Sequence, residues 1–262
     1  MNFDYIPIWS ILIGTILIVM LSLETGYRLG HRSRRRSDDE KESPVSAIAG
    51  SVLGLVAFMM AFTFGIVANR YDSRKALVRE EANSIGTTWL RADFLPETDR
   101  AEAKALLKEY AIQRVTAIEN LRSGKLRSED MGKALEKVTR IHNRLWEMAV
   151  TNARKDMNSD VAALYIDSLN GLIDLHAMRV AVALQSRIPI GIWSVLLGLT
   201  FLGMVAIGYQ LGIAGSRRSL AQPILAISFS MVIALIFSLD RPHGGYIKVS
   251  QQPFIDLIKS ME

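Results

Sequence analysis

The side chains that could do chemistry in this sequence are few, and their spacing decides what they can do. There are four histidines, His31, His142, His176 and His243, and no cysteine. None of the histidines stands in an ExxH or HExxH arrangement, the spacing by which one helix face presents two ligands to a metal. The sequence also has no P-loop and no G-x-G-x-x-G fingerprint. It therefore predicts a protein that is not an enzyme and that carries no metal and no cofactor.

Two weaker candidate sites involve titratable side chains on predicted helices. His142 falls in the apolar stripe of its helix, which favours a partnered interfacial histidine over a metal ligand. Glu80 and Glu81, close to Asn83, could bind a cation. Neighbouring residues on a helix point about 100° apart, so one helix cannot easily use both carboxylates. A cation site is therefore disfavoured.

Phe58 and Phe62 are four residues apart and so lie on one face of a helix. Periodicity alone favours apolar bulk that faces lipid or a neighbouring helix. The alternative is a ring of aromatic side chains, one set per subunit, that constricts a central pore. Apolar constrictions gate channels by dewetting and let weakly hydrated ions pass.

The elements that must position these residues are visible in the distribution of charge. All 31 Lys and Arg and all 26 Asp and Glu lie outside four uncharged runs. Each run is about 19 to 26 residues long, and a helix needs about 20 residues to cross the hydrocarbon core of a bilayer. The runs are approximately 5–23, 46–68, 188–213 and 220–239. The sequence therefore predicts four transmembrane helices in two pairs, with the lipid bilayer as an obligatory partner.

The segment between the two pairs is polar and helical. The second span is predicted to continue as a helix to Pro96, and further helices begin near Glu97, near Ser128 and at about Ser159. The last of these is expected to run directly into the third span. No stretch shows the alternation that is typical of a strand, so the predicted fold class is all-α.

Four regions follow from these elements. Residues 1–69 hold spans one and two with a basic loop at 26–44, and residues 70–187 form the polar helical domain. Residues 188–239 hold spans three and four, and residues 240–262 form an amphipathic C-terminal tail that could lie on the membrane surface or under a neighbouring subunit. Charges of both signs are interspersed in 70–187, which indicates a solvated helical surface and not a nucleic-acid-binding stripe.

Small residues and charges near the span ends give three further hypotheses. The pairs Gly50–Gly54 and Gly208–Gly212 have GxxxG spacing, which lets helix backbones approach closely. Arg70, Arg74 and Lys75 follow the second span and could form a positive vestibule or be ordinary juxtamembrane charge. Asp240 and Arg241 follow the fourth span at once and are expected at the same membrane face as Arg70 and Asp72, where these groups could form ion pairs.

The two short basic loops predict the orientation. The loop at 26–44 contains five arginines, and Arg217 and Arg218 lie between spans three and four. By the positive-inside rule both loops face the cytoplasm, so both termini are outside. Against this stand Arg70, Arg74, Lys75 and Arg79 just beyond the second span.

Two segments resemble a known family. LVAFMMAFTFGIVANRYDSRKALVREEANSIGTTWLRADFLP (residues 55–96) and LDRPHGGYIKVSQQP (residues 239–253) are similar to the bacterial bestrophin-like membrane proteins. The resemblance extends from about residue 45 to 255. This family is distantly similar to the bestrophin anion channels, so the resemblance implies a bacterial inner membrane protein and a homo-oligomer, pentameric by analogy.

The resemblance also implies a pore lined by the second span. It places the two neck aromatics of bestrophins on Phe58 and Phe62, and the third neck residue, a branched aliphatic, on Gly54. This departure predicts that the constriction at Gly54 is wider or absent. A further departure is that bestrophins have a large domain after the fourth span, whereas 22 residues follow Asp240 in this sequence, and the acidic calcium clasp of animal bestrophins is not recognisable in it. Bestrophins keep their termini in the cytosol, which contradicts the orientation that the positive-inside rule predicts.

Three functions from different classes remain. The first is a homo-oligomeric channel for small inorganic anions such as chloride. The second is a membrane-anchored interaction or sensory module without conductance. The third, a transporter, is disfavoured because no charge lies within a span and Pro7, Pro44, Pro189 and Pro223 all lie near span ends.

Overall fold

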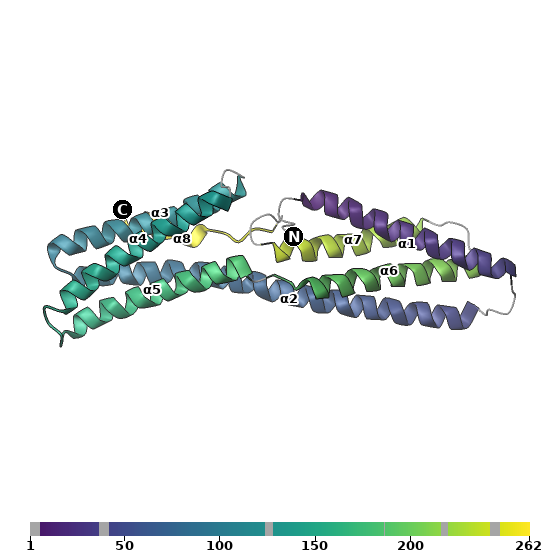
Figure 1. The fold of residues 1–262 in the computed structure, drawn as a ribbon, viewed down its shortest axis with the longest axis horizontal. Coiled ribbons are helices and arrows are strands. Elements are labelled where there is room, and N and C mark those ends of the chain that lie inside the picture. The colour runs from purple at the N-terminus through teal and green to yellow at the C-terminus, as the bar shows by residue number, and fades with distance from the viewer. Residues whose placement is uncertain (1–5, 37–41, 124–127, 186, 216–219, 242–246) are drawn as a thin grey trace. The chain divides into compact units, whose positions relative to one another are not determined.

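The computed structural model describes residues 6–36, 42–123, 128–185, 187–215, 220–241 and 247–262 (Figure 1). The predicted loop residues 37–41 and the loop arginines Arg217 and Arg218 therefore lie outside the described residues. The described residues form eight α-helices: α1 (Ile8–Arg36), α2 (Glu42–Arg91), α3 (Glu97–Arg122), α4 (Ser128–Ala153), α5 (Asp160–Gln185), α6 (Ile190–Ile213), α7 (Ala221–Asp240) and α8 (Gln252–Ser260). The prediction of an all-α fold is confirmed.

Four of these helices, α1, α2, α6 and α7, are long and apolar enough to cross a membrane. Each of them overlaps one of the four uncharged runs, and α3, α4 and α5 lie between the two pairs in the chain. The chain folds into two compact units. The first contains residues 1–70 and 187–247, and the second contains 71–186 and 248–262. Helix α2 contributes residues to both units.

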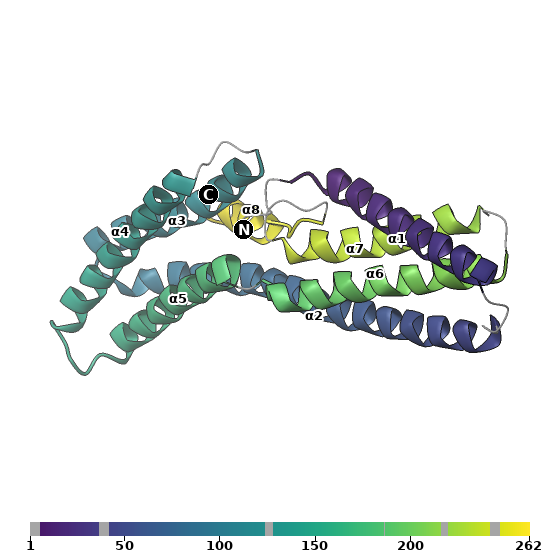
Figure 2. The same ribbon diagram turned by 45° about the vertical axis from the view of Figure 1, so that its right-hand side comes forward.

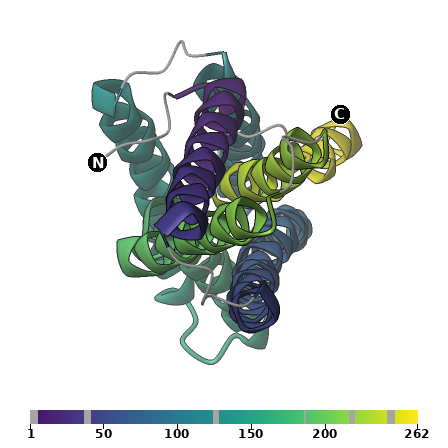
Figure 3. The same cartoon turned by 90° about the vertical axis from the view of Figure 1, so that its right-hand side faces the viewer.

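In the first unit, α1 packs along α6 and also contacts α7 (Figures 2 and 3). The approach of α1 to α6 depends on glycine, because a Cβ atom on Gly208 would lie 2.1 Å from the carbonyl oxygen of Leu23. A Cβ on Gly26 would likewise lie 2.1 Å from the carbonyl oxygen of Val205. Val19, Leu23, Met204 and Ala226 form the buried core beside this contact.

Two helix boundaries differ from the sequence-based expectation. Residues 26–36 of the expected basic loop are helical, because α1 continues through Arg36. The expected continuous helix from the polar segment into the third span is wrong. Helix α5 ends at Gln185, and α6 begins at Ile190 after Pro189 as its N-cap. Pro189 has no backbone N–H, and it disfavours helical geometry at the residue before it, which explains the break.

The second unit is a helical bundle. As predicted, α2 continues well past its uncharged part and ends before Pro96, through a short 3-10 turn, η2 (Ala92–Phe94). Its core is a single cluster of buried side chains from α2, α3, α4, α5 and the C-terminal segment. The largest fully buried members include Tyr110, Tyr165 and Phe254.

The C-terminal segment has a different location from the one expected for an amphipathic tail. Helix α8 packs against α3, and its Phe254 is fully buried in the bundle core. Leu257 and Ile258 pack against the same core. Its apolar face is therefore covered by the chain's own bundle and is not available to the membrane surface.

Candidate functional site

Helix α2 exposes the two phenylalanines on its outer face in the first unit. The side chains of Phe58 and Phe62 are 64% and 53% exposed, and their rings stack with centroids 6.4 Å apart. Gly54, one turn earlier, is also exposed, and a Cβ there would meet open space. On the opposite face, Val56 and Thr63 are fully buried. The four-residue spacing thus places the aromatics and Gly54 together, away from the other helices of the unit.

The outward stripe of α2 differs in composition from the outward faces of the other spans. On α1, α6 and α7 the exposed side chains include Trp9, Leu17, Ile18, Leu21, Phe201, Leu202, Ile224, Ile227 and Met231, which are suited to lipid. The α2 stripe, at helical spacing, consists of Ala47, Ser51, Gly54, Phe58, Phe62, Gly65 and Asn69. The two aromatics are adjacent at the centre of the stripe, and small or polar residues lie on both sides of them. Small residues permit close approach of another helix, or leave space for water.

A shallow apolar groove lies beside this stripe, between α2 and α7. Its volume is about 410 Å³. The residues that line it are Ala57, Met60, Ala61, Phe64, Ser228, Phe229 and Val232. A Cβ atom on Gly50 would meet open space, so Gly50, like Gly54, touches no other helix of this unit. Among the described residues, no atom outside α2 therefore lies within 4 Å of a Cβ built on either glycine of the Gly50–Gly54 pair.

The Gly208–Gly212 pair, by contrast, meets the backbone of α1. A Cβ on Gly212 would lie 2.4 Å from the carbonyl oxygen of Tyr27. Its counterpart on α1 is a second GxxxG pair, Gly26–Gly30, which was not among the predicted packing residues. The spacing is visible in the sequence, but these residues lie beyond the predicted end of the first span.

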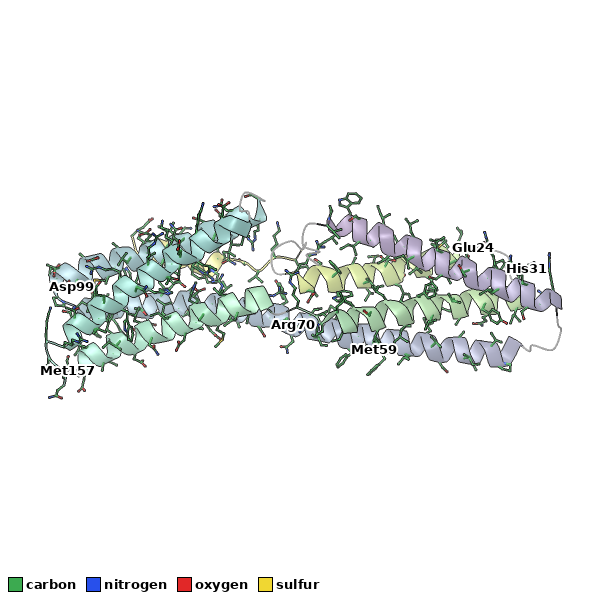
Figure 4. The ribbon with its side chains drawn as sticks, viewed as in Figure 1. Glu24, His31, Met59, Arg70, Asp99 and Met157 are labelled. Atoms are coloured by element: carbon green, nitrogen blue, oxygen red, sulfur yellow. The ribbon has the colours of Figure 1, made fainter. Side chains whose placement is uncertain are left out.

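The charges at the end of the spans are arranged around Asp240. Its Oδ1 lies 3.5 Å from Arg70 Nη1, which Figure 4 shows on α2, and accepts a hydrogen bond from the backbone N–H of Ile188 at 3.1 Å. Arg241 instead donates to the carbonyl oxygen of Ile6 at 2.5 Å and lies over the Phe237 ring. The charge of Arg70 is thus offset by a carboxylate.

The other charged residues singled out near this position belong to the second unit. Lys75 and Asp72 are exposed, and Arg74 is partly buried and has interacting partners. Of the three bases proposed for a vestibule, Lys75 is the most accessible to solvent.

A buried carboxylate lies at the centre of the second unit. Glu81 is 0% exposed, whereas its neighbour Glu80 is exposed. Arg179 on α5 and Tyr110 on α3 donate hydrogen bonds to the two oxygens of Glu81, and Arg114 lies 3.3 Å away through Nε. The negative charge of Glu81 is compensated by the guanidinium groups of Arg114 and Arg179. This environment therefore does not favour the binding of a cation at Glu81.

Two histidines complete this network. His176 Nδ1 lies 3.1 Å from the Tyr110 hydroxyl and 3.7 Å from Glu81 Oε1. His142 is interfacial, as expected from its apolar stripe, and packs edge-on against the rings of Tyr110 and His176 at 4.8 and 5.0 Å between centroids. Its buried Nε2 has no hydrogen-bond partner among the described residues. The neutral imidazole is therefore the form that this environment favours.

The electrostatics of the network follow from burial and pairing. Burial alone would raise the pKa of Glu81, but contacts with His176, Arg114, Arg179 and Tyr110 outweigh it and hold the pKa at about 2. Burial, together with the adjacent His176, lowers the pKa of His142 to about 4. Burial and the neighbouring Glu81 raise the pKa of the Tyr110 hydroxyl. At neutral pH the network therefore holds an ionised Glu81 and a neutral His142.

The network also holds the C-terminal segment. Arg179 Nη2 donates to Gln251 Oε1 at 3.1 Å, and its guanidinium lies over the Phe254 ring at 5.1 Å from the centroid. Arg122 donates to the carbonyl oxygen of Val249 at 2.6 Å. Glu81 thus links α2 to α3, to α5 and, through Arg179, to the segment that contains α8.

These features define a multi-pass, all-helical membrane protein with four candidate spans and a polar bundle. The family model of the bestrophin-like domain matches residues 8–254, and the chain belongs to the bestrophin-like family. The resemblance that the sequence suggested is thereby confirmed.

A solved crystal structure described as that of a membrane protein has a similar fold. It superposes with a TM-score of 0.55 at 13% sequence identity, over 95% of each chain. The chain has no significant match among the curated proteins searched.

Proposed function

We propose that this protein forms a homo-oligomeric channel, permeable to small inorganic anions such as chloride, with a pore lined by α2. The observation that carries the proposal is the outward stripe of α2. It combines Phe58 and Phe62 with small and polar residues, whereas the exposed large side chains of α1, α6 and α7 are aliphatic or aromatic and suited to lipid. A face of this kind is suited to a water-filled lumen with an apolar constriction.

An oligomer is required because one copy of α2 cannot enclose a lumen. Membership of the bestrophin-like family supports this assembly, with five subunits by analogy with bestrophins. Gly54 leaves the pore wide one turn before the aromatics. The exposed Lys75 and the partly buried Arg74 would raise the local concentration of anions. The charge of Arg70 contributes less, because Asp240 lies beside it.

The test is halide flux into liposomes that contain the purified protein. We expect Phe58→Ala/Phe62→Ala to change the rate or the selectivity of this flux. A matched control is Leu197→Ala/Phe201→Ala, which removes two exposed apolar side chains, also four residues apart, from the outer face of α6. Flux that responds to both double variants alike would contradict a pore along α2.

The second candidate is an interaction or sensory module without conductance. The continuous course of α2 from the span to Glu81, and the link from Glu81 to the C-terminal segment, support this alternative. It predicts no halide flux from wild-type protein that is shown to be folded. Members of the bestrophin-like family are generally not enzymes, and neither candidate is a catalyst.

A further inference from the structure

Helix α1 presents a second stripe to the outside, and its character changes along the helix. Leu17 and Leu21 are 58% and 65% exposed, and Arg28, Arg32 and Arg35 follow at helical spacing and are also exposed. At about 100° per residue these five positions fall within a sector of roughly 60°. The stripe is therefore aliphatic over one part and basic over the next.

The packing of α1 fixes this stripe as the outward face. Gly26 and Gly30 lie on the opposite side of the helix, where their backbone touches α6. Arg34 does not belong to the stripe. Its guanidinium group contacts Gly215, which lies just past the last residue of α6. The close backbone contact at Gly26 and Gly30 thus places the arginine positions of the stripe on the side of α1 that faces away from α6.

The position of the arginines matches the depth of lipid headgroups. About 20 helical residues cross the hydrocarbon core, so a span that begins at Ile8 leaves it near Arg28. Arg32 and Arg35 follow within about 10 Å along the helix axis. Arg28 is partly neutralised by Glu24 at 2.7 Å, and Figure 4 shows Glu24 and His31 along the same part of α1. Arg32 and Arg35 therefore carry most of the attraction for an anion.

We propose that this surface, Leu17, Leu21, Arg28, Arg32 and Arg35, binds an anionic phospholipid. The acyl chains would lie along the two leucines, and the phosphate would accept hydrogen bonds from the guanidinium groups of Arg32 and Arg35. Guanidinium groups bind phosphate oxygens in a bidentate manner, which favours this chemistry over simple attraction to the membrane. The proposal does not depend on whether the protein conducts ions.

The experiment compares binding of phosphatidylglycerol and phosphatidylcholine to the full chain in neutral detergent, by native mass spectrometry. We expect wild type to prefer phosphatidylglycerol. Each basic residue near an anionic surface contributes about fivefold in affinity, so Arg32→Gln/Arg35→Gln should weaken phosphatidylglycerol binding by about 30-fold. The matched control is Arg140→Gln/Arg154→Gln, two exposed arginines of the polar bundle, which should leave binding unchanged.

Three results would overturn the proposal. The first is equal binding of both lipids to wild type, a result that needs no variant and so does not depend on how well a variant folds. The second is binding of phosphatidylglycerol to the Arg32→Gln/Arg35→Gln protein with the affinity of wild type. The third is displacement of phosphatidylglycerol by inorganic phosphate, which would indicate a site for a free anion and not for a lipid.

Discussion

Glu81 on α2 accepts a hydrogen bond from Arg179 on α5, and both side chains are buried in the polar bundle, with exposed fractions of 0% and 8%. The pair joins α2, which continues from the second span, to α5. Arg179 of α5 also donates a hydrogen bond to Gln251 in the C-terminal segment. A buried ion pair of this kind is costly to break, because removal of one partner leaves the other charge without compensation.

The first prediction concerns this pair. Glu81→Gln leaves Arg114 and Arg179 close together without their shared anion, so it should lower the free energy of unfolding by about 3–5 kcal/mol. Chemical unfolding in detergent, followed by circular dichroism, measures the change. The control is Glu80→Gln, an exposed neighbour on the same helix, which should change stability by no more than about 0.5 kcal/mol. Equal effects of the two substitutions would contradict a central role for Glu81.

The second prediction concerns pH. His142 has a pKa of about 4 in the folded protein against 6.5 as its ordinary value, so the unfolded chain binds the proton more readily. The stabilising contribution is complete above pH 6.5 and is lost as the pH falls toward 4, by roughly 3 kcal/mol in all. Glu81, whose pKa of about 2 lies below its ordinary value of 4.5, adds a further loss that begins as the pH falls below 4.5 and is complete only near pH 2.

Unfolding curves at several pH values test this prediction. The variant His142→Phe keeps an aromatic ring against Tyr110 and removes the titrating group. Its stability should vary much less between pH 6.5 and 4 than that of wild type. A wild-type curve that is flat across this range would show that His142 is not held in its neutral form.

The third prediction compares two glycines of α6. Gly208→Ala would place a methyl group 2.1 Å from a backbone oxygen of α1, so the helices must separate. We expect a loss of about 1–3 kcal/mol in the free energy of unfolding. Gly198→Ala meets nothing within 4 Å and should be neutral, or stabilising by up to about 1 kcal/mol through helix propensity. Thermal unfolding in one detergent, for both variants, decides whether the close contact of α1 and α6 exists.

The fourth prediction concerns the orientation of the chain in the membrane. The natural chain has no cysteine, so a single introduced cysteine reports on one site only. By the positive-inside rule, Glu262→Cys should react with a membrane-impermeant maleimide applied to intact cells, and Arg35→Cys should react only after lysis. The reverse pattern would show that the termini lie in the cytosol, as in bestrophins.

The sequence by itself determined the four spans, the helical class and the continuous second helix. A long uncharged run that crosses a bilayer must satisfy its own backbone hydrogen bonds, and an α-helix does so within one segment. Helix α2 ends before Pro96 because a proline sterically disfavours helical geometry at the residue before it. The four-residue spacing of Phe58 and Phe62 also fixed their common face. These are properties of consecutive residues, so they can be predicted without knowledge of the fold.

Only the tertiary structure decided which distant residues meet. Glu81 was visible in the sequence only as one of two adjacent acids, because its partners Tyr110, Arg114, His176 and Arg179 come from helices that begin many residues later. The same holds for the match of Gly26 and Gly30 with Gly208 and Gly212, and for the burial of α8 in the bundle. Such contacts depend on helix packing, which no local spacing specifies.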